Sequence, residues 1–187
     1  HVPLAIGTQT NGSVIRPASF CGTYAFKPTH GVISRRGILQ TSKSLDQVGV
    51  FARTLEDAAL LTDAIGCFDP ADPSSYARAR PNTVQGCASD VPVEPNFVYI
   101  DMPYHDRLST DTRAGFDELI EALGGQVECV GSSPNLANLI EVQSLIHEYE
   151  IVHHLDQTFT DHWDQLSTSI QPIIERGRKI SEAQYED

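Results

Sequence analysis

Residues 2–27, VPLAIGTQTNGSVIRPASFCGTYAFK, form the stretch that decides the fold. The apolar run at 2–6 predicts a short buried strand, and the small polar residues at 7–13 predict a turn after it. Pro17 suits the first turn of a helix over 17–22, because its missing N–H would have no partner there. The segment therefore predicts a strand, a turn and a helix in direct succession.

Outward from this stretch, apolar periodicity and turn-forming residues predict alternating strands and helices. Strands are expected at 23–27, 32–34, 97–100 and 127–130. Helices are expected between Thr54 and Gly66, over 110–123, 136–157, 159–166 and 169–178, and from Ser181 onward, with Thr54 and Ser181 as N-caps. The β-α-β pattern of 97–130 is expected to pair its strands in parallel, with a right-handed crossover. Residues 69–95 are rich in proline and are expected to form a long loop or linker. The predicted fold class is α/β.

The composition is that of a folded globular protein. Of the 187 residues, 40% are hydrophobic and 20% are charged, and the net charge of −12 argues against a broad nucleic-acid-binding surface. The charge is uneven, because residues 1–50 contain five basic residues and one acidic residue, Asp46. No run of about 18 apolar residues indicates a membrane helix. We expect neither nucleic acid nor a membrane as a partner.

The four cysteines, Cys21, Cys67, Cys87 and Cys129, are far apart and form no C-x-x-C pair. This spacing argues against a zinc ribbon or a thioredoxin-like motif. We expect reduced and mostly buried thiols, as in a cytoplasmic protein. No leader peptide is visible at the start of the sequence.

Three sets of side chains have both a chemical and a structural interpretation. Cys21 and His30 could form a thiol nucleophile, but nothing orients the pair, so a packed thiol is the simpler interpretation. Phe159 and Trp163 are expected in the core or as a lid over a cleft. A third set shares one helical face and could bind a metal: His147, Glu150 and His154. The H-E-x-x-H pattern fails in this third set, so an exposed polar face is favoured.

The turn at 7–13 places Ser13 where a strand delivers the chain towards a helix. A serine hydroxyl at such a turn faces open space, and successive backbone N–H groups can stabilise an anion beside it. Acyl transfer needs this combination of a nucleophile and N–H donors. From these residues alone, a plain structural loop remains the simpler interpretation, because Gly-Ser turns after strands are common.

A longer comparison favours the chemical interpretation. Residues 7–37, GTQTNGSVIRPASFCGTYAFKPTHGVISRRG, closely resemble the signature region of the amidase signature family, and so do residues 44–61, SLDQVGVFARTLEDAALL. The resemblance implies an α/β/α fold around a mixed, mostly parallel central sheet. Residues 1–187 would form a middle portion of this single domain, with a signature segment at 1–68, a linker at 69–95, and a β-α-β unit followed by helices at 96–187.

The resemblance implies hydrolysis of the amide bond of a small-molecule substrate by a Ser-Ser-Lys triad, without a metal or an organic cofactor. It assigns the nucleophile to Ser13 and the oxyanion-hole N–H groups to Thr10, Asn11 and Gly12, and it places Thr8 close to the triad. The family's lysine and cis-peptide serine precede the signature serine, so they are expected upstream of this chain. Residues 1–187 alone are therefore expected to hydrolyse no amide.

Four residues in or near the signature need a separate interpretation. Asn11 replaces the family's usual glycine, and asparagine is the least costly replacement if that position needs a positive φ. Gln9 stands where many members have aspartate. Arg16 either binds a polar or carboxylate-bearing substrate or pairs with Asp46 and braces the loop. Lys27 matches the K-P-T element of the family and is interpreted as structural.

Two alternative functions stay open. The A subunit of a tRNA-dependent amidotransferase shares the signature, but those subunits usually read G-S-I-R-x-P where residues 12–17 read GSVIRP, which favours a free-standing amidase. A non-catalytic scaffold that kept the fold is the alternative of another class. An unpaired sheet edge and apolar patches would favour association, so a homo-oligomer also stays open.

Overall fold

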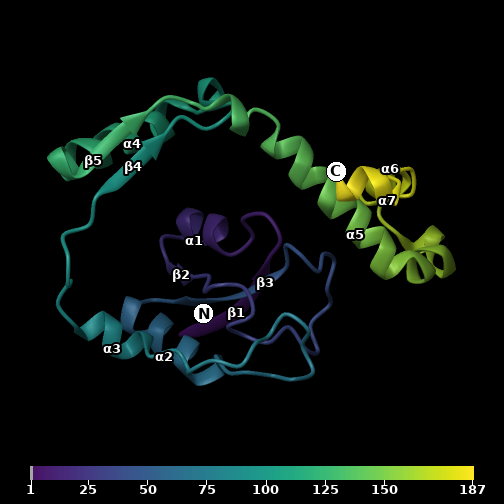
Figure 1. The fold of residues 1–187 in the computed structure, drawn as a ribbon, viewed down its shortest axis with the longest axis horizontal. Helices are drawn as coiled ribbons and strands as arrows, with labels where there is room; N and C mark the ends of the chain where they lie inside the picture. Colours follow the sequence, from purple (N-terminus) through teal and green to yellow (C-terminus); the bar gives the residue numbers. More distant parts are fainter. Residues whose placement is uncertain (1) are drawn as a thin grey trace. The chain divides into compact units, whose positions relative to one another are not determined.

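The computed structural model describes residues 2–187 and divides into two compact units. The first unit contains the residues up to Ser89 and Leu145–Asp187, and the second contains Asp90–Ser144. Figure 1 shows the chain as a ribbon coloured along the sequence. Both helices and strands are present, so the predicted α/β class is confirmed.

The first unit combines a small sheet with helices. Its elements are β1 (Leu4–Gln9), α1 (Ile15–Cys21), β2 (Tyr24–Phe26), β3 (Gln47–Ala52), α2 (Leu55–Ile65), α3 (Thr83–Ala88), most of α5 (Leu139–Asp161), α6 (Gln171–Gly177) and α7 (Glu182–Glu186). The second unit contains β4 (Phe97–Ile100), α4 (Thr110–Leu123) and β5 (Val127–Val130). Single 3-10 turns lie at 105–107, 124–126, 134–136 and 163–165.

The three-stranded sheet has the order β1-β3-β2, and both outer strands run antiparallel to β3. The first strand extends past its predicted end, because its last residue, Gln9, still pairs with Gln47 of β3. The following helix begins at Ile15, two residues earlier than predicted. The turn between strand and helix is therefore shorter than the sequence pattern indicates.

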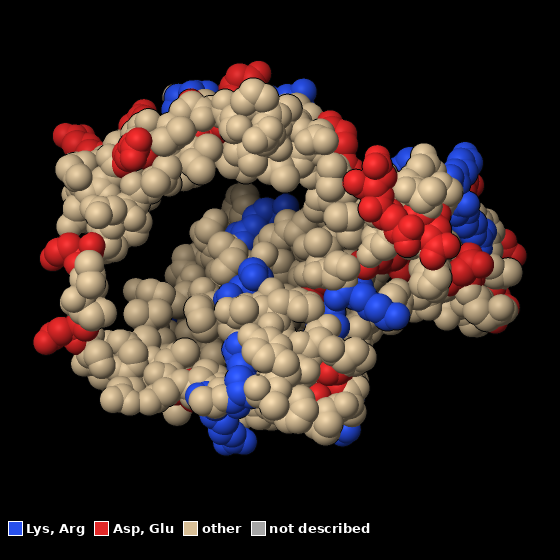
Figure 2. Space-filling model, viewed as in Figure 1, with Lys and Arg blue, Asp and Glu red and all other residues tan. Residues whose placement is uncertain are grey.

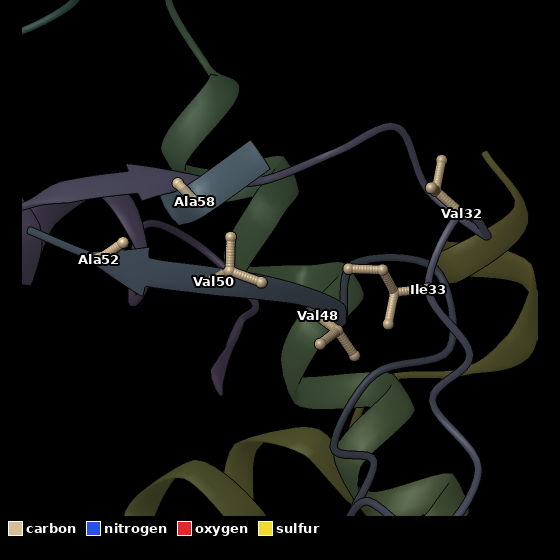
Figure 3. Close-up of a cluster of buried hydrophobic side chains, with 6 residues drawn as sticks. All are labelled: Val32, Ile33, Val48, Val50, Ala52 and Ala58. Carbon is tan, nitrogen blue, oxygen red and sulfur yellow. The ribbon is translucent and has the colours of Figure 1, made fainter. Parts of the chain in front are cut away.

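The core of this sheet is a cluster of small and branched side chains. Figure 3 shows its buried members, Val32, Ile33, Val48, Val50, Ala52 and Ala58. Three of them come from β3 and lie on one face, because alternate residues of a strand point the same way. The strand predicted at 32–34 is wrong: this segment is irregular, and its two apolar residues fill the core without pairing with a strand.

Helix α2 begins as the sequence predicts. The Thr54 hydroxyl oxygen accepts a hydrogen bond from the Asp57 N–H at 3.1 Å, which satisfies a donor that the helix leaves unpaired. Thr62 is polar but buried, and its hydroxyl donates to the Ala58 carbonyl at 2.8 Å. Leu55, at the start of the helix, is exposed.

The helices at the end of the chain form their own core around Ile151, Phe159 and Ile174. The core interpretation of Phe159 is confirmed, and Trp163 packs against the cluster. Helix α5 continues through residue 158, where the sequence predicted a break between two helices. The break does not occur because residue 158 is neither glycine nor proline.

Helix α7 starts with the predicted cap. The Ser181 side chain accepts from the Gln184 N–H, and the Gln184 side chain accepts from the Ser181 N–H, so two donors are satisfied reciprocally. Figure 2 shows acidic side chains gathered over the region of α5 to α7, in line with the acidic excess of this part of the sequence.

The second unit is the predicted β-α-β unit. β4 and β5 pair in parallel, with α4 between them in sequence, so the predicted parallel pairing is confirmed. The Ser109 side chain caps α4 by accepting from the Thr112 N–H at 3.2 Å. Within residues 2–187 parallel pairing occurs in this sheet, whereas the sheet of the first unit is antiparallel.

The stretch expected as a long loop contains a helix. The Asp63 carboxylate accepts from the N–H groups of Thr83 and Val84 at 2.8 and 3.0 Å, and this contact fixes the start of α3. The preceding loop is also anchored, because buried Asp72 accepts from the Arg35 N–H at 2.7 Å. Groups far away in sequence, the Asp63 carboxylate and the Arg35 N–H, thus order a segment that has no periodicity of its own.

The cysteines are free thiols, as expected, but their predicted burial is wrong. Cys21, Cys87 and Cys129 are exposed and Cys67 is half-buried, because these residues lie outside both core clusters. Among residues 2–187, no helix is both long enough and apolar enough to span a membrane.

Candidate active site

Ser13 is exposed and lies in the short turn between β1 and α1. Residues 9–16, which form this turn and its two ends, are called the serine turn. The next residue, Val14, is fully buried. Thr8 lies at the exposed end of β1, where it pairs with Val48. The turn therefore presents the serine outward while the neighbouring valine anchors it to the sheet.

The anchor depends on a glycine in the neighbouring strand. A Cβ atom at Gly49 of β3 would lie 2.7 Å from the Val14 side chain and 3.0 Å from the Phe26 carbonyl oxygen. Both distances are shorter than ordinary van der Waals contact, so a side chain at position 49 would push Val14 out of its place. Gly49 is therefore the residue that lets the serine turn dock onto the sheet.

Gln9 holds the start of α1. Its side-chain oxygen Oε1 accepts from the N–H groups of Val14 and Ile15 at 3.0 and 3.1 Å. N–H groups in the first turn of a helix have no partner within the helix, so this contact supplies one from the preceding strand. The Arg16 N–H donates to the Gly12 carbonyl at 2.8 Å and closes the turn. Gln9 is thus a structural support of the serine turn.

Thr10 is fixed by Asp46. The Thr10 hydroxyl donates to Asp46 Oδ1 at 2.5 Å, and Asp46 Oδ2 accepts from the N–H groups of Thr41 and Ser42 at 2.6 and 2.9 Å. Asp46 is 5% exposed. A buried carboxylate therefore connects the serine turn to the loop that precedes β3.

The turn requires glycine at position 12 rather than at position 11. Gly12 has a φ of +121°, a conformation that residues with a side chain rarely adopt. Asn11 does not have a positive φ, so an asparagine at this position causes no backbone strain.

Arg16 does not form the pair with Asp46 that the bracing interpretation requires. Arg16 is exposed, and its Cζ would lie 3.8 Å from a Cβ placed on Gly12. The bracing interpretation is wrong: the Asp46 carboxylate accepts from hydroxyl and N–H donors of Thr10, Thr41 and Ser42 and forms no ion pair with Arg16. Lys27 has the structural contact that was expected, since its Nζ donates to Gln47 Oε1 at 2.8 Å.

A second buried carboxylate, Glu150 of α5, lies in a cluster of hydroxyl groups. It accepts from the Ser42 hydroxyl, from the Ser44 N–H and hydroxyl at 3.1 and 2.6 Å, and from the Tyr185 hydroxyl at 2.8 Å. Burial raises the pKa of the Glu150 carboxyl, but these hydrogen bonds outweigh burial and hold the pKa below its ordinary value. Glu150 is therefore a buried anion stabilised by the protein.

This cluster corrects the expectation for the helical face of His147, Glu150 and His154. Glu150 is 5% exposed, so the face is not the exposed polar one that was favoured. His154 Nδ1 lies 3.0 Å from the carbonyl oxygen of Glu150. Across residues 2–187 no group of three or more His, Cys, Asp or Glu side chains could hold a metal ion.

The predicted site residues occupy one continuous strand, turn and helix: Thr8, Thr10, Asn11, Gly12, Ser13 and Arg16. Sequence reasoning did not identify Gln9 and Gly49 as supports of this turn, and it paired the third support, Asp46, with Arg16 instead of Thr10. A signal for Asp46 existed, because it is the one acidic residue among the first fifty. A single carboxylate in a basic segment has many donors available, but the sequence does not reveal which of them it meets.

The fold and the site together define an α/β protein that presents a serine on a firmly held strand-to-helix turn. The chain belongs to the amidase family: the model of the family described as Amidase matches residues 1–183.

Curated relatives support this membership. The chain is 39% identical over 146 residues to the A subunit of glutamyl-tRNA(Gln) amidotransferase from Gloeobacter violaceus, and the match covers 76% of this chain and 29% of that protein. The corresponding protein from Nostoc punctiforme is 51% identical over 79 residues, which cover 42% of this chain and 16% of the relative. The chain thus spans less than a third of the length of these relatives.

Solved structures share the fold. A vestigial protein complex linked to the origins of an s-triazine catabolic enzyme contains a chain that matches with a TM-score of 0.87 and 26% identity, over 99% of this chain and 40% of that one. A crystal structure of an amidase matches with a TM-score of 0.73 and 26% identity, over 98% of this chain and 39% of that one. The amidase-signature fold implied by the sequence is therefore confirmed.

Proposed function

We propose that this chain supplies the nucleophile of an enzyme that cleaves carboxylic amides, and that Ser13 is the attacking residue. The docking of the serine turn carries the proposal. Val14 is locked against Gly49 and Gln9 holds the helix start, so Ser13 stays exposed on a fixed backbone. The family match over residues 1–183 supports the same assignment.

A serine hydroxyl is a weak nucleophile and needs a base. By the resemblance to the amidase signature family, the proton of Ser13 passes through a cis-peptide serine to a lysine, both from upstream segments. As the bond between Oγ and the amide carbon forms, the carbonyl electron pair moves onto oxygen. The amine or ammonia leaves with a proton returned by the lysine, and water then hydrolyses the acyl-serine to release the acid.

The turn also offers the donors for the developing oxyanion. In this proposal the backbone N–H groups of Thr10, Asn11 and Gly12 bind the oxyanion. Removing one such donor from an enzyme costs about 10²–10³ in kcat, so their placement matters as much as the nucleophile. The hydrogen bond from Thr10 to Asp46 and the φ of Gly12 support a turn held in one conformation.

Arg16 is assigned to the substrate. Its guanidinium lies beside Gly12 at the surface and forms no ion pair with a carboxylate of residues 2–187. A guanidinium recognises a carboxylate or another planar polar group through paired hydrogen bonds. We infer that it binds a polar end of a small-molecule amide, and that Thr8 lies at the edge of the same site.

A second candidate function is that of an amidotransferase A subunit. The names of the curated relatives, at 39% and 51% identity, favour it over the free-standing amidase that the string GSVIRP indicates. Both candidates use the same step at Ser13, and they differ in whether the amide nitrogen is released or transferred. The free and mostly exposed thiols support a cytoplasmic location for either protein.

The test compares Ser13→Ala with Ser19→Ala in the full-length protein that contains this chain. Ser19 is exposed on α1 and serves as the matched control. We expect Ser13→Ala to lower amide turnover by about 10³-fold or more, and Ser19→Ala to leave it unchanged. Ammonia release reports turnover, circular dichroism reports folding, and mass spectrometry detects the acyl-serine.

Near-normal turnover by folded Ser13→Ala would exclude the assignment. The same assay with and without co-purified partner proteins separates the two candidates. Full activity of the isolated protein supports the amidase. Activity that requires partners, and in which the amide nitrogen is transferred instead of released, supports the amidotransferase.

A further inference from the structure

We propose that Glu150 of α5 is a positioning residue for the serine turn, acting through Ser42 and Asp46 on Thr10. The inference rests on the proposed function of Ser13 and extends it to a helix distant in sequence. Its basis is a continuous series of hydrogen bonds within the first unit.

The first step of the series joins the serine turn to the loop before β3. Asp46 Oδ1 accepts a hydrogen bond from the Thr10 hydroxyl at 2.5 Å, and Oδ2 accepts from the Thr41 and Ser42 N–H groups at 2.6 and 2.9 Å. Because Asp46 is 5% exposed, water cannot readily replace these donors. The place of Thr10 is thus set by the backbone of residues 41–42.

The second step joins that loop to α5. Ser42 is 0% exposed, and it donates its N–H to Asp46 and its hydroxyl to Glu150. The neighbouring Ser44 donates both its N–H and its hydroxyl to Glu150 at 3.1 and 2.6 Å. Glu150 therefore fixes Ser42, which donates to Asp46, and also Ser44 in the same loop, and it accepts from the Tyr185 hydroxyl at 2.8 Å.

The hydrogen bonds from Thr10 through Asp46 and Ser42 to Glu150 account for the position of the serine turn better than for the stability of the fold. Buried ionic groups are often no more stabilising than apolar side chains of similar size. Ser42, however, donates a hydrogen bond to each of the two carboxylates, and the direction of these two hydrogen bonds fixes the position of Ser42 between them. An oxyanion donor acts only when it is held within about 0.5 Å of the productive geometry, and Thr10 contributes one of the proposed donors. A loosened Glu150 would therefore displace the donor without touching the substrate.

The first experiment measures kcat and KM in the full-length protein for Glu150→Gln, with Glu148→Gln as the matched control. Glu148 lies on the same helix and forms an ion pair with Arg176 at 2.6 Å, not a contact with Ser42 or Ser44. Rates are normalised by active-site titration, so that a smaller folded fraction does not count as a slower step. We expect Glu150→Gln to lower kcat about tenfold with little change in KM, and Glu148→Gln to change neither.

The second experiment is a double-mutant cycle between Thr10→Val and Glu150→Gln. The hydroxyl of Thr10 and the carboxylate of Glu150 contact different partners, but both belong to the proposed series. If the series exists, the losses in kcat overlap and the double variant is little worse than the single ones. Fully additive losses would overturn the proposal.

A third measurement is independent of activity. Hydrogen exchange of the amides at 9–16 should become faster in Glu150→Gln and stay unchanged in Glu148→Gln. If the wild-type protein cleaves no amide but this exchange changes, the proposed function fails while the structural coupling stands. Unchanged exchange in a folded variant overturns the positioning role, and Ser44→Ala, which removes one donor to Glu150, replaces Glu150→Gln if that variant does not fold.

Discussion

The β-α-β unit at 97–130 and the serine turn at 9–16 are built in different ways. In the β-α-β unit, both strands and the helix form where the local pattern predicts, and Ser109, which caps the helix, directly precedes it. The serine turn has an equally clear motif, but its supports come from elsewhere. Asp46 and Gly49 lie more than thirty residues further along.

The comparison separates two kinds of sequence information. Apolar periodicity and caps specify an element that satisfies most of its own hydrogen bonds. A turn with an exposed residue and a positive φ cannot supply all of its own hydrogen-bond partners, so it depends on contacts with the sheet and the neighbouring loop. Substitutions at these contacts should therefore lower stability more than comparable substitutions in the β-α-β unit.

The largest effect is expected from Gly49→Ala. The new Cβ would meet both the Val14 side chain and the Phe26 carbonyl oxygen, which belongs to the backbone and cannot move aside. We expect a loss of about 1–3 kcal/mol in the free energy of unfolding, together with a drop in amide turnover as the turn shifts. Urea denaturation and the ammonia assay measure the two effects.

Gly7→Ala is the matched control for this substitution. Gly7 lies opposite Gly49 in the sheet, but its Cβ would meet a ring atom of Phe51, which can rotate. We expect a smaller loss of stability and little change in turnover. Equal losses for the two variants would contradict the role given to Val14.

A smaller and gradual effect is expected at acid pH. Burial raises the pKa of Glu150 and of Asp72, but hydrogen bonds outweigh it and hold both pKa values below their ordinary range. The unfolded chain therefore takes up protons first. The stability from these carboxylates is complete above the ordinary carboxyl pKa of about 4 and is lost as the pH falls through the lower folded value.

Denaturant midpoints measured from neutral to acid pH test this expectation. Glu150→Gln removes one of the two carboxylates, so it should reduce the loss of stability on acidification. An identical pH dependence in wild-type protein and variant would show that Glu150 does not contribute to it.

The smallest effect is expected in the β-α-β unit. Gly115 is exposed in α4, and a Cβ placed there meets no atom within 4 Å. Gly115→Ala should stabilise the helix by about 0.5–1 kcal/mol, because glycine loses more conformational freedom on folding than alanine. A thermal-denaturation curve measures the gain, and a lower melting temperature would reveal a backbone conformation or contact at Gly115 that alanine does not tolerate.

Several elements could be predicted because their signals are local. The cap at Thr54, the cap at Ser181 and the parallel pair of 97–100 with 127–130 depend on residues within a few turns of each other or within one supersecondary unit. The predicted strand at 32–34 failed for the opposite reason. Its apolar residues are buried in the core, but no neighbouring strand is available to pair with them.

The candidate site divides in the same way. The motif at 7–37 places Ser13 and the residues around it, since they are consecutive. The role of Arg16 could not be decided from the sequence, because binding of a substrate and pairing with the Asp46 carboxylate were both open to it. Thr10, Thr41 and Ser42 occupy that carboxylate instead, and only the folded chain brings these donors together.

The sequence by itself determined the family, the order of most elements and the identity of the proposed nucleophile. These depend on short segments whose residues act on their near neighbours. The tertiary structure decided which groups hold the serine turn in place: Gln9 on the helix start, Gly49 beneath Val14, and Asp46 and Glu150 on either side of Ser42. Buried carboxylates need several donors at once, and a chain gathers such donors from distant segments only when it folds.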